Sequence, residues 1–517
     1  MDYDYIIIGS GFGGSVSALR LSQKGYKVLV VEKGKWYKAE DFPKTNWNFR
    51  KWLWLPKIRF FGIMKLTIFR HVAILSGTGV GGGSLVYGNT LPIPKSTFFK
   101  SGSWSQLKNW EQELQPFYTE ALRMLGATKT PKLFDGDLGL KKVAEKFGID
   151  KKFDTTNVGV YFGEENITKP DPYFNGVGPE RTGCNYCGAC MTGCRNNSKN
   201  SLDKNYLYLA QQNGAEILAE NEVYDIRQLN ENKGYEVAIK STTKIPVKRQ
   251  KIRSKGVIFS GGVLGTVKLL LKLKTTSLPK LSNQLGNHIR TNNETLVSVS
   301  TLDKNKNFSK GVAIGSILHT SQDSHLEICR YGEGSDAWKL AHLPYVTGGN
   351  TISRLAKIFM NLFKSPVTFF KTYITNSWAK KTVVLLFMQT LDSTLKFKLN
   401  AFGGVSSTMS NGKKPTPYIP ESDKLIKEYT KAVNGVSTSF LLETIAGIPS
   451  TAHILGGAVM GANPSEGVIN QDNKVFGYDN MFVIDGSMIS SNPGVNPSLS
   501  ITAIAEHAMD QIPLKSQ

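Results

Sequence analysis

Residues 5–14 read YIIIGSGFGG, a short apolar run that leads directly into a glycine-rich turn. The unbroken apolar run is typical of a strand buried on both faces of a parallel sheet. Residues 15–24 have the pattern of a helix, and residues 28–31, VLVV, predict a second buried strand that ends at Glu32. This order of strand, glycine turn, helix, strand and acid predicts a dinucleotide-binding βαβ unit.

Three glycines of the turn have separate physical roles in holding a pyrophosphate. Gly9 permits the tight turn, Gly11 lets backbone approach the phosphates, and Gly14 lets the helix pack closely on the strand. The N-terminus of the helix adds unpaired N–H groups and a positive dipole. Glu32 is placed to accept hydrogen bonds from a ribose. This unit alone does not distinguish NAD from FAD, or a substrate from a prosthetic group.

Length and charge narrow the class of protein. The chain has 517 residues, more than one hydrophobic core usually serves, so we expect two domains or one elaborated domain. Its net charge is +22, but the basic residues are spread along the chain without a known nucleic-acid module, so we expect no nucleic-acid partner. No segment approaches the roughly 18 apolar residues that span a bilayer. Because the first strand begins at Tyr5, we expect no signal peptide and a cytoplasmic location.

Two stretches mix basic and large apolar side chains, at residues 47–70 and 354–371. Such stretches can lie on an anionic membrane surface. They are also compatible with core packing that has a solvated basic rim. The sequence leaves peripheral membrane contact and core packing both open.

The order of elements indicates how the rest of the chain is used. An aromatic insertion at about 36–70 lacks clean periodicity and is expected to cover something, and the loop after it, SGTGVGGGS at 76–84, can lie against a ligand. Residues 215–226 and 235–240 predict a small antiparallel pair. Residues 256–273 repeat the strand–glycine–helix order, which predicts a return to the nucleotide domain. Alternating apolar runs within 296–399 predict an antiparallel sheet that faces a pocket.

Taken together, these motifs resemble the glucose–methanol–choline (GMC) oxidoreductases, most closely the cholesterol oxidase branch, over nearly the whole chain. The resemblance is carried by the N-terminal fingerprint, GVGGGSLV at 79–86, SLDK at 201–204, FSGGVLG at 259–265, HILGG at 453–457, VIDGS at 483–487 and GVNP at 494–497. It implies an α/β fold in which a Rossmann-like FAD-binding domain joins a substrate domain built on an antiparallel sheet with covering helices. We expect the FAD-binding domain at 1–290, including a cysteine-rich loop at about 171–200, the substrate domain at 291–452, and the C-terminal part of the FAD-binding domain at 453–517.

The resemblance also implies a set of residues that hold FAD. Asp485 and Gly486 match a turn that puts backbone N–H groups near the pyrophosphate and ribityl chain, Val223 matches a backbone contact on the adenine side, and Asn89 is a candidate flavin contact. The full set is Gly9, Gly11, Gly14, Glu32, Gly79, Gly81, Gly82, Gly83, Ser84, Asn89, Val223, Asp485, Gly486 and Pro497. Tyr87 and Thr78 depart from the residues that family members often carry.

The expected reaction is oxidation of a sterol or another bulky lipid alcohol, with hydride transfer to flavin. The alcohol must lose its hydroxyl proton, which requires a nearby group with a suitable pKa. His453 matches the active-site histidine of the family, and Asn496 matches an asparagine beside the flavin. Glu327 resembles the glutamate that moves a proton between steroid carbons to isomerise a double bond. An ordinary surface glutamate remains the alternative for this position. Either oxygen or a protein would accept the electrons.

Four cysteines do not belong to this pattern. Cys184, Cys187, Cys190 and Cys194 form C-x2-C-x2-C-x3-C, the spacing of an iron–sulfur run. The sequence leaves open an iron–sulfur cluster, zinc or no metal, whereas structural disulfides are not expected in a cytoplasmic chain. A cluster near FAD would imply a protein electron acceptor rather than direct reaction with oxygen. Two alternatives therefore stay open: a dehydrogenase of fatty alcohols or sugars that uses such a cluster, and a non-catalytic flavin carrier or membrane-associated binding protein.

Overall fold

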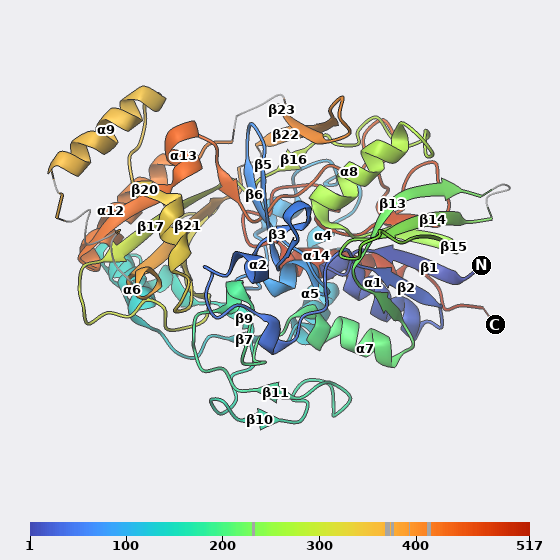
Figure 1. Cartoon of the computed structure of the whole chain (residues 1–517), viewed down its shortest axis with the longest axis horizontal. Helices are drawn as coiled ribbons and strands as arrows, with labels where there is room; N and C mark the ends of the chain where they lie inside the picture. Colours follow the sequence, from blue (N-terminus) through green and yellow to red (C-terminus); the bar gives the residue numbers. More distant parts are fainter. Residues whose placement is uncertain are drawn as a thin grey trace.

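The computed structural model describes residues 1–516 except 230–232, 365, 368–372, 374–376, 392 and 411–414. Two large sheets organise the molecule, one on each side of Figure 1. The first contains the N-terminal strands, and the second is assembled mainly from the latter half of the chain. The C-terminal helix returns to the first sheet, so both termini lie on the same side of the molecule.

The N-terminal unit begins with β1 (Tyr3–Ile8), α1 (Phe12–Gln23) and β2 (Val28–Val31). The first sheet has the strand order β12-β2-β1-β15-β14-β13, and β26 also pairs with β15. Its other strands are β12 (Glu216–Leu218), β13 (Asn221–Gln228), β14 (Tyr235–Ser241), β15 (Arg249–Phe259) and β26 (Met481–Val483). β1 pairs in parallel with β2 and β15, with Ile7 opposite Val30 and Ile258. The predicted parallel βαβ unit is confirmed, and its strands are buried as their apolar runs require.

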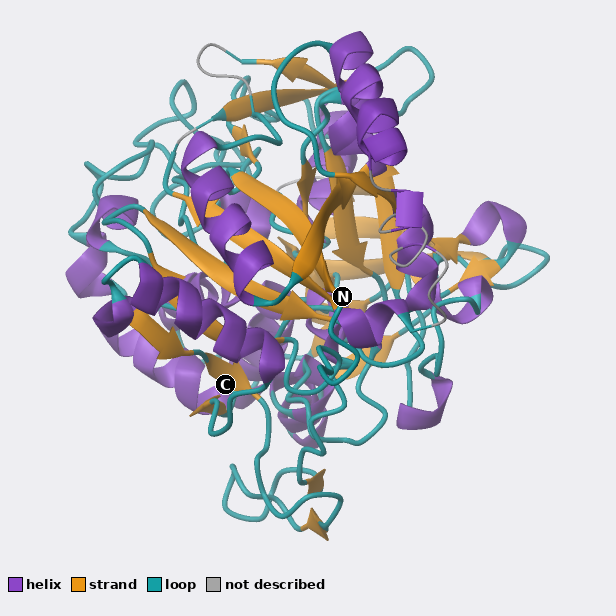
Figure 2. Cartoon of the chain, turned by 90° about the vertical axis from the view of Figure 1, so that its left-hand side faces the viewer, coloured by secondary structure: helices purple, strands orange, loops and turns teal. Residues whose placement is uncertain are grey.

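Helices cover both faces of this sheet (Figures 1 and 2). α1 packs against α14 (Ser498–Asp510) and α7 (Tyr206–Gln212), and α8 (Gly262–Lys274) lies near β13. Two short helices, α4 (Trp110–Glu113) and α5 (Gln115–Met124), meet at Leu114, and the proline at the second position of α5 suits a helix start.

The second sheet is antiparallel, with strand order β20-β24-β17-β21-β19-β18-β8. Its strands are β20 (His342–Pro344), β24 (Gly435–Phe440), β17 (Glu294–Thr301), β21 (Thr382–Gln389), β19 (Ser324–Arg330), β18 (Ile314–His319) and β8 (Phe153–Thr155). Alternate residues such as Val297 and Leu385 pack under α6 (Asp135–Lys146) and α12 (Pro420–Ala432). Their neighbours Leu296 and Leu386 line a pocket on the opposite face. The predicted pocket-facing antiparallel sheet is confirmed.

The aromatic insertion forms a small layer between the two sheets. It contains α2 (Phe49–Trp52), β3 (Trp54–Leu55), β4 (Phe60–Phe61) and β5 (Met64–Ile68), and β5 pairs with β6 (Ala73–Gly77). β25 (Ser450–Thr451) then adds to β6 in parallel. Trp52 packs with Trp338 in a cluster of its own, whereas Trp47 and Ile58 are exposed. The insertion therefore combines core packing with an apolar outer surface.

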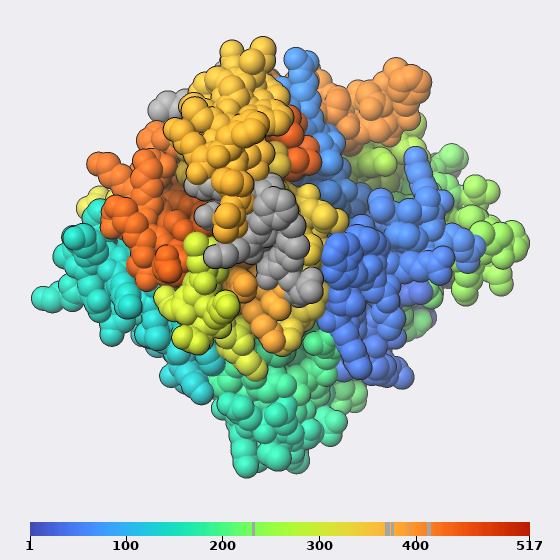
Figure 3. Space-filling model, turned by 60° about the vertical axis from the view of Figure 1, so that its left-hand side comes forward, coloured from blue at the N-terminus to red at the C-terminus, as the bar shows by residue number. Residues whose placement is uncertain are grey.

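Two further features lie outside the sheets. The turn-rich region with β10 (Thr168–Lys169) and β11 (Arg181–Thr182) projects from the body, at the bottom of Figures 1 and 2. The helix α9 (Thr351–Lys364) lies on the surface, and in Figure 3 it shares one face of the molecule with the blue N-terminal insertion. In the part of the chain that the structure describes, no helix is both long and apolar enough to cross a bilayer.

Candidate active site

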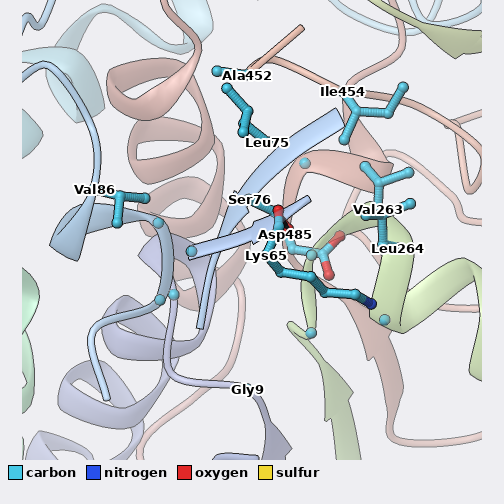
Figure 4. A pocket seen from close by; sticks show the side chains of 18 of the residues that line it. Gly9, Lys65, Leu75, Ser76, Val86, Val263, Leu264, Ala452, Ile454 and Asp485 are labelled. Carbon is cyan, nitrogen blue, oxygen red and sulfur yellow. Dashed lines mark hydrogen bonds between the residues drawn. The ribbon is translucent and has the colours of Figure 1, made fainter. Parts of the chain in front are cut away.

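A cavity of about 680 Å³ lies between the two sheets. Figure 4 shows it bordered by the first glycine turn, by β5 and β6, by the start of α8 and by the C-terminal motif near Asp485. It opens at the carboxyl ends of β1 and β2, where ligands bind in parallel α/β sheets. The second sheet closes its other side.

The two glycine loops form one backbone surface in this cavity. Gly9 has a φ of +101°, and a Cβ there would lie 2.3 Å from the carbonyl oxygen of Ser260. A Cβ on Gly82 would lie 2.7 Å from the Cα of Gly11, so the loops touch through bare backbone. A Cβ on Gly11 would meet no atom within 4 Å, because this position faces the cavity. Such a cradle fits a pyrophosphate that must approach backbone N–H groups closely.

Glu32 is held at the edge of this cradle. Its carboxylate accepts hydrogen bonds from the backbone N–H and hydroxyl of Ser10, at 3.1 and 2.8 Å, and from the N–H of Gly34 at 2.9 Å. Ser10 Oγ also accepts from the N–H of Gly81, which joins the two glycine loops. Sequence reasoning missed Ser10, although its place between two glycines of the fingerprint was a usable signal.

The other predicted cofactor residues fall into two groups. Residues that line the cavity are Gly9, Gly11, Glu32, Gly82, Gly83, Val223, Asp485, Gly486 and Pro497. Gly14, Gly79, Gly81, Ser84 and Asn89 lie behind this lining. Gly14 packs against Gly9, and Ser84 Oγ donates to the carbonyl of Gly81 and accepts from the N–H of Leu202. These two residues support the cradle rather than line the cavity.

Asp485 and Asn89 differ in whether their buried polar groups have hydrogen-bond partners. Asp485 is buried, accepts hydrogen bonds from Ser487 and Thr266, and starts the turn that brings Gly486 to the cavity wall. Burial raises the pKa of its carboxyl group, although these donors oppose the shift. Asn89 is fully buried at a φ of +69°, and among the described residues its side-chain amide has no hydrogen-bond partner. An orphaned amide beside the cavity residue Gly88 fits a site that receives a polar cofactor.

Lysines gather at the same cavity. Lys33, Lys65, Lys240, Lys268 and Lys272 all line it. Lys65 extends from β5 toward the start of α8 (Figure 4). Burial, together with the nearby charges of Lys33 and Lys268, lowers the pKa of Lys65 to about 8. Lysines at a cavity wall can attract a dianionic pyrophosphate, and the sequence motifs gave no sign of them.

His453 lies where the glycine cradle meets the second sheet. Its Nδ1 is 2.8 Å from Glu294 Oε2, at the first residue of β17, and both side chains are largely buried. Burial alone would lower the pKa of His453, but the Glu294 carboxylate outweighs it and holds the pKa above its ordinary value. Because Nδ1–H donates to Glu294, the neutral ring keeps a free lone pair on Nε2. Nε2 is therefore the atom that can take a proton.

Asn496 and Glu327 continue this line of polar groups. The Asn496 side-chain nitrogen is 3.5 Å from His453 Nε2, but turning the amide over lets that nitrogen donate to Glu327 Oε1 and Oε2, at 2.9 and 3.2 Å. We assign the turned orientation, since it pairs donor with acceptor. Glu327 is fully buried on the pocket-facing side of β19, and its Oε1 is 3.5 Å from His325 Nε2. It is not a surface glutamate.

The structure brings the three predicted catalytic residues together and adds Glu294. The only sequence signal for Glu294 was an acidic residue at the start of an apolar strand. The adjoining wall of the cavity is largely apolar and is formed by Leu296, Ile314, Cys329, Tyr331, Val384, Leu386 and Phe440. A polar proton acceptor at the edge of a large apolar wall suits an alcohol with a bulky hydrocarbon body.

Comparisons with known proteins agree with this arrangement. Two family models, both described as GMC oxidoreductase, match residues 3–289 and 419–505. A cholesterol oxidase of Acinetobacter baumannii is 44% identical, covering 99% of this chain and 95% of the relative. A cholesterol oxidase of Mycobacterium tuberculosis is 40% identical, covering 100% of this chain and 92% of the relative. The crystal structure of pyridoxine 4-oxidase from Mesorbium loti aligns with a TM-score of 0.62 over 98% of both chains, at 12% identity, and so shares the fold.

Proposed function

Because this chain belongs to the GMC oxidoreductase family, whose members are FAD-dependent oxidoreductases of CH–OH groups, we propose that it oxidises a sterol or another bulky lipid alcohol. The observation that carries this proposal is the Glu294–His453 pair at the junction of the glycine cradle and the apolar wall. Two relatives of at least 40% identity named cholesterol oxidase support a sterol as the substrate class.

Bound FAD would supply the hydride acceptor for this reaction. The glycine cradle, Glu32 and the Asp485–Gly486 turn would hold its nucleotide and phosphates, and the lysines at the cavity would balance its charge. The apolar residues on β17, β19 and β21 would receive the hydrocarbon body and exclude water. The hydroxyl-bearing carbon would thus be positioned beside His453 and Asn496.

His453 is the proposed acceptor of the hydroxyl proton. Glu294 holds Nδ1–H, so Nε2 faces the reacting hydroxyl as a base and the resulting imidazolium stays next to a carboxylate. The Asn496 side chain lies beside the same ring, its amide nitrogen donates to Glu327, and it would help to orient the alcohol oxygen. The carbonyl product forms when the oxygen loses its proton and the carbon loses a hydride.

Glu327 is the proposed base for moving a steroid double bond. Its complete burial and its contact with the Asn496 amide support this role over that of a surface glutamate. Moving a proton between two carbons of a ketone needs one group that both takes and returns the proton. Glu327→Gln is expected to leave alcohol oxidation measurable and to abolish the isomerised product.

Anaerobic bleaching of the flavin by a panel of alcohols tests the proposal. Sterols are expected to reduce the flavin, and His453→Ala is expected to retain FAD while reduction slows by roughly 10²- to 10⁴-fold. Bleaching by fatty alcohols or sugars but not by sterols would favour the alternative dehydrogenase. Unchanged reduction in the histidine variant, or no bleaching by any alcohol, would refute the proposed role.

A peripheral membrane contact would bring such a substrate to the enzyme. α9 exposes Ile352, Phe359 and Phe363 with fractional exposures of 77%, 60% and 82%, and it carries the exposed Lys357. Ile58 of the insertion is also 59% exposed. Apolar side chains beside lysines suit a surface of anionic lipid.

A further inference from the structure

The cysteine-rich loop gathers its thiols around one small cavity, separate from the main pocket. All four cysteines of the run line this second cavity: Cys184, Cys187, Cys190 and Cys194. None of them forms a disulfide. The chain reaches this arrangement through left-handed backbone at Tyr186, Gly188 and Gly193, with φ values of +54°, +67° and +98°. The loop is therefore folded around the thiols and is not extended.

Positive charge surrounds these thiols. Lys199 is buried, and its Nζ donates to the carbonyl oxygens of Cys190, Leu85 and Tyr87 at 2.8, 3.1 and 3.0 Å. Arg181 is close enough to Cys194, and Arg195 to Cys187, to interact electrostatically. Buried cations are costly without compensating negative charge, and thiolate ligands would supply it.

We propose that these four cysteines ligate one four-iron iron–sulfur cluster. The C-x2-C-x2-C-x3-C spacing fits such a cluster. In two-cluster ferredoxins the fourth cysteine of this run serves another cluster, but here Cys194 lines the same cavity as the other three. A cluster ligated by all four is the arrangement that this geometry offers.

The same geometry disfavours zinc. A single zinc ion needs four ligand atoms at about 2 Å from one point. Among the described residues, no three His, Cys, Asp or Glu side chains are arranged to hold one metal ion. In a four-iron cluster each thiolate binds a different iron, so the ligands stand around a cavity instead of meeting at its centre. Four thiols on the wall of one cavity are compatible with that arrangement.

The cluster site adjoins the cofactor pocket. Met191, next to Cys190, lines the main cavity. Lys199 ties the backbone of Cys190 to that of Leu85 and Tyr87, which belong to or follow the second glycine loop. The ligation itself does not depend on which alcohol the enzyme oxidises, so it can be tested separately from the proposed function.

Metal analysis of the full-length protein, purified without oxygen, tests the assignment. We expect about four irons and about four acid-labile sulfides per chain, and an electron paramagnetic resonance signal after reduction with dithionite. Cys187→Ser is expected to lose most of the iron and to change that signal. Cys329→Ser removes the buried fifth cysteine, which lies on β19 outside the loop, and should keep both. FAD content measured in each variant separates loss of the cluster from loss of the fold.

The wild-type protein alone is enough to overturn the proposal. One zinc per chain would refute it, as would no uptake of iron and sulfide after anaerobic reconstitution with ferrous iron and sulfide. The same iron content and resonance signal in Cys187→Ser as in the wild type would also refute it. Each of these results can be obtained without measuring alcohol oxidation.

Discussion

The contact between Glu294 and His453 sets both the orientation and the proton affinity of the imidazole. The carboxylate is 2.8 Å from Nδ1, and the two side chains keep only 2% and 13% exposure. Solvent therefore screens this interaction little. The carboxylate raises the pKa of His453 against the opposing effect of burial. Glu294 acts through His453 and is a positioning residue in this scheme.

This pair predicts a pH dependence for flavin reduction. His453 must be neutral to accept a proton, so the rate should fall as pH decreases through its raised pKa. In Glu294→Gln the carboxylate is absent while burial remains, so the pKa should fall and the inflection should move to lower pH. We also expect the limiting rate at high pH to decrease by at least roughly tenfold. Stopped-flow flavin reduction across pH measures both effects.

Glu443→Gln is a matched control for this experiment. Glu443 is also buried, and burial raises its pKa to about 8, so it is largely neutral at pH 7 and the amide resembles it closely. Among the described residues Glu443 makes no hydrogen bond or ion pair with His453. Exchanging a neutral carboxyl for an amide leaves the charge near Glu294 unchanged, so this variant should keep the wild-type inflection. An unshifted profile in Glu294→Gln, or an equal shift in both variants, would contradict the positioning role.

The sequence identified the site residues that lie in short motifs, but it did not identify those that reach the site through contacts between distant segments. His453 and Asn496 each lie in a motif of four or five residues, so spacing was enough to select them. Glu294 contacts His453 across 159 positions of sequence and belongs to no motif. Lys65 becomes significant only because the β5–β6 hairpin folds over the cavity.

The β5–β6 hairpin shows how an element without recognisable periodicity gains a role. The sequence predicted only that the insertion covers something. In the structure β5 alternates between buried Met64 and partly exposed Lys65, and Lys65 lies along the cavity wall. A strand at the pocket edge can thus offer an apolar face to the core and a charge to a ligand.

Replacing Lys65 is expected to weaken FAD retention. Lys65→Gln removes a partly desolvated cation, and we expect roughly a tenfold increase in the dissociation constant for FAD. The lysine loses its charge above a pKa of about 8, so wild-type retention should decline as pH rises from 7 to 9, and the variant should show less of this decline. Titration of apoprotein with FAD, followed by flavin fluorescence, measures both.

Lys57→Gln, in the same insertion but outside the cavity lining, should leave FAD binding unchanged. Equal affinity in wild type and Lys65→Gln at every pH would remove Lys65 from the site.

Elements with clear periodicity were predicted well. The side chains of residues 382–387 point alternately to the two faces of the second sheet. One face of β21 packs under the covering helices, and the other lines the cavity. The antiparallel pair predicted at 215–226 and 235–240 is present as β13 and β14, whereas residues 216–218 form β12, which pairs in parallel with β2. The pair also extends the parallel sheet through β15, which the sequence did not indicate. Hydrophobic periodicity indicates that one face of a strand is buried, but it does not indicate to which sheet a pair of strands adds.

At the scale of the whole molecule, the site exists only because distant segments meet. Glu32 follows the second strand, Glu294 begins β17, and His453 precedes the return of the chain to the first sheet through β26. The similarity of motifs along the chain predicted this assembly. Residues 354–371, of which the structure describes 354–364, 366 and 367, allowed both membrane contact and core packing, since amphipathic character does not say whether a face meets protein or lipid.

The surface of α9 leads to a prediction about membrane binding. We expect the protein to sediment with vesicles that contain anionic lipid, and less so at high salt, because screening weakens the attraction of lysines to lipid headgroups. The double substitution Phe359→Ser and Phe363→Ser removes two exposed rings from one face of the helix. Each ring buries a large apolar area in a lipid interface, so binding should weaken at least about tenfold.

Leu514→Ser separates this effect from a general loss of surface hydrophobicity. Leu514 is 74% exposed, but it lies close to the C-terminus, at the far end of the molecule from α9 (Figure 1). Its variant should sediment with vesicles as the wild type does. Sterol presented in vesicles should then be oxidised more slowly by the double variant, while sterol in detergent is oxidised at the wild-type rate. Equal vesicle binding by wild type and double variant would show that α9 is not the contact surface.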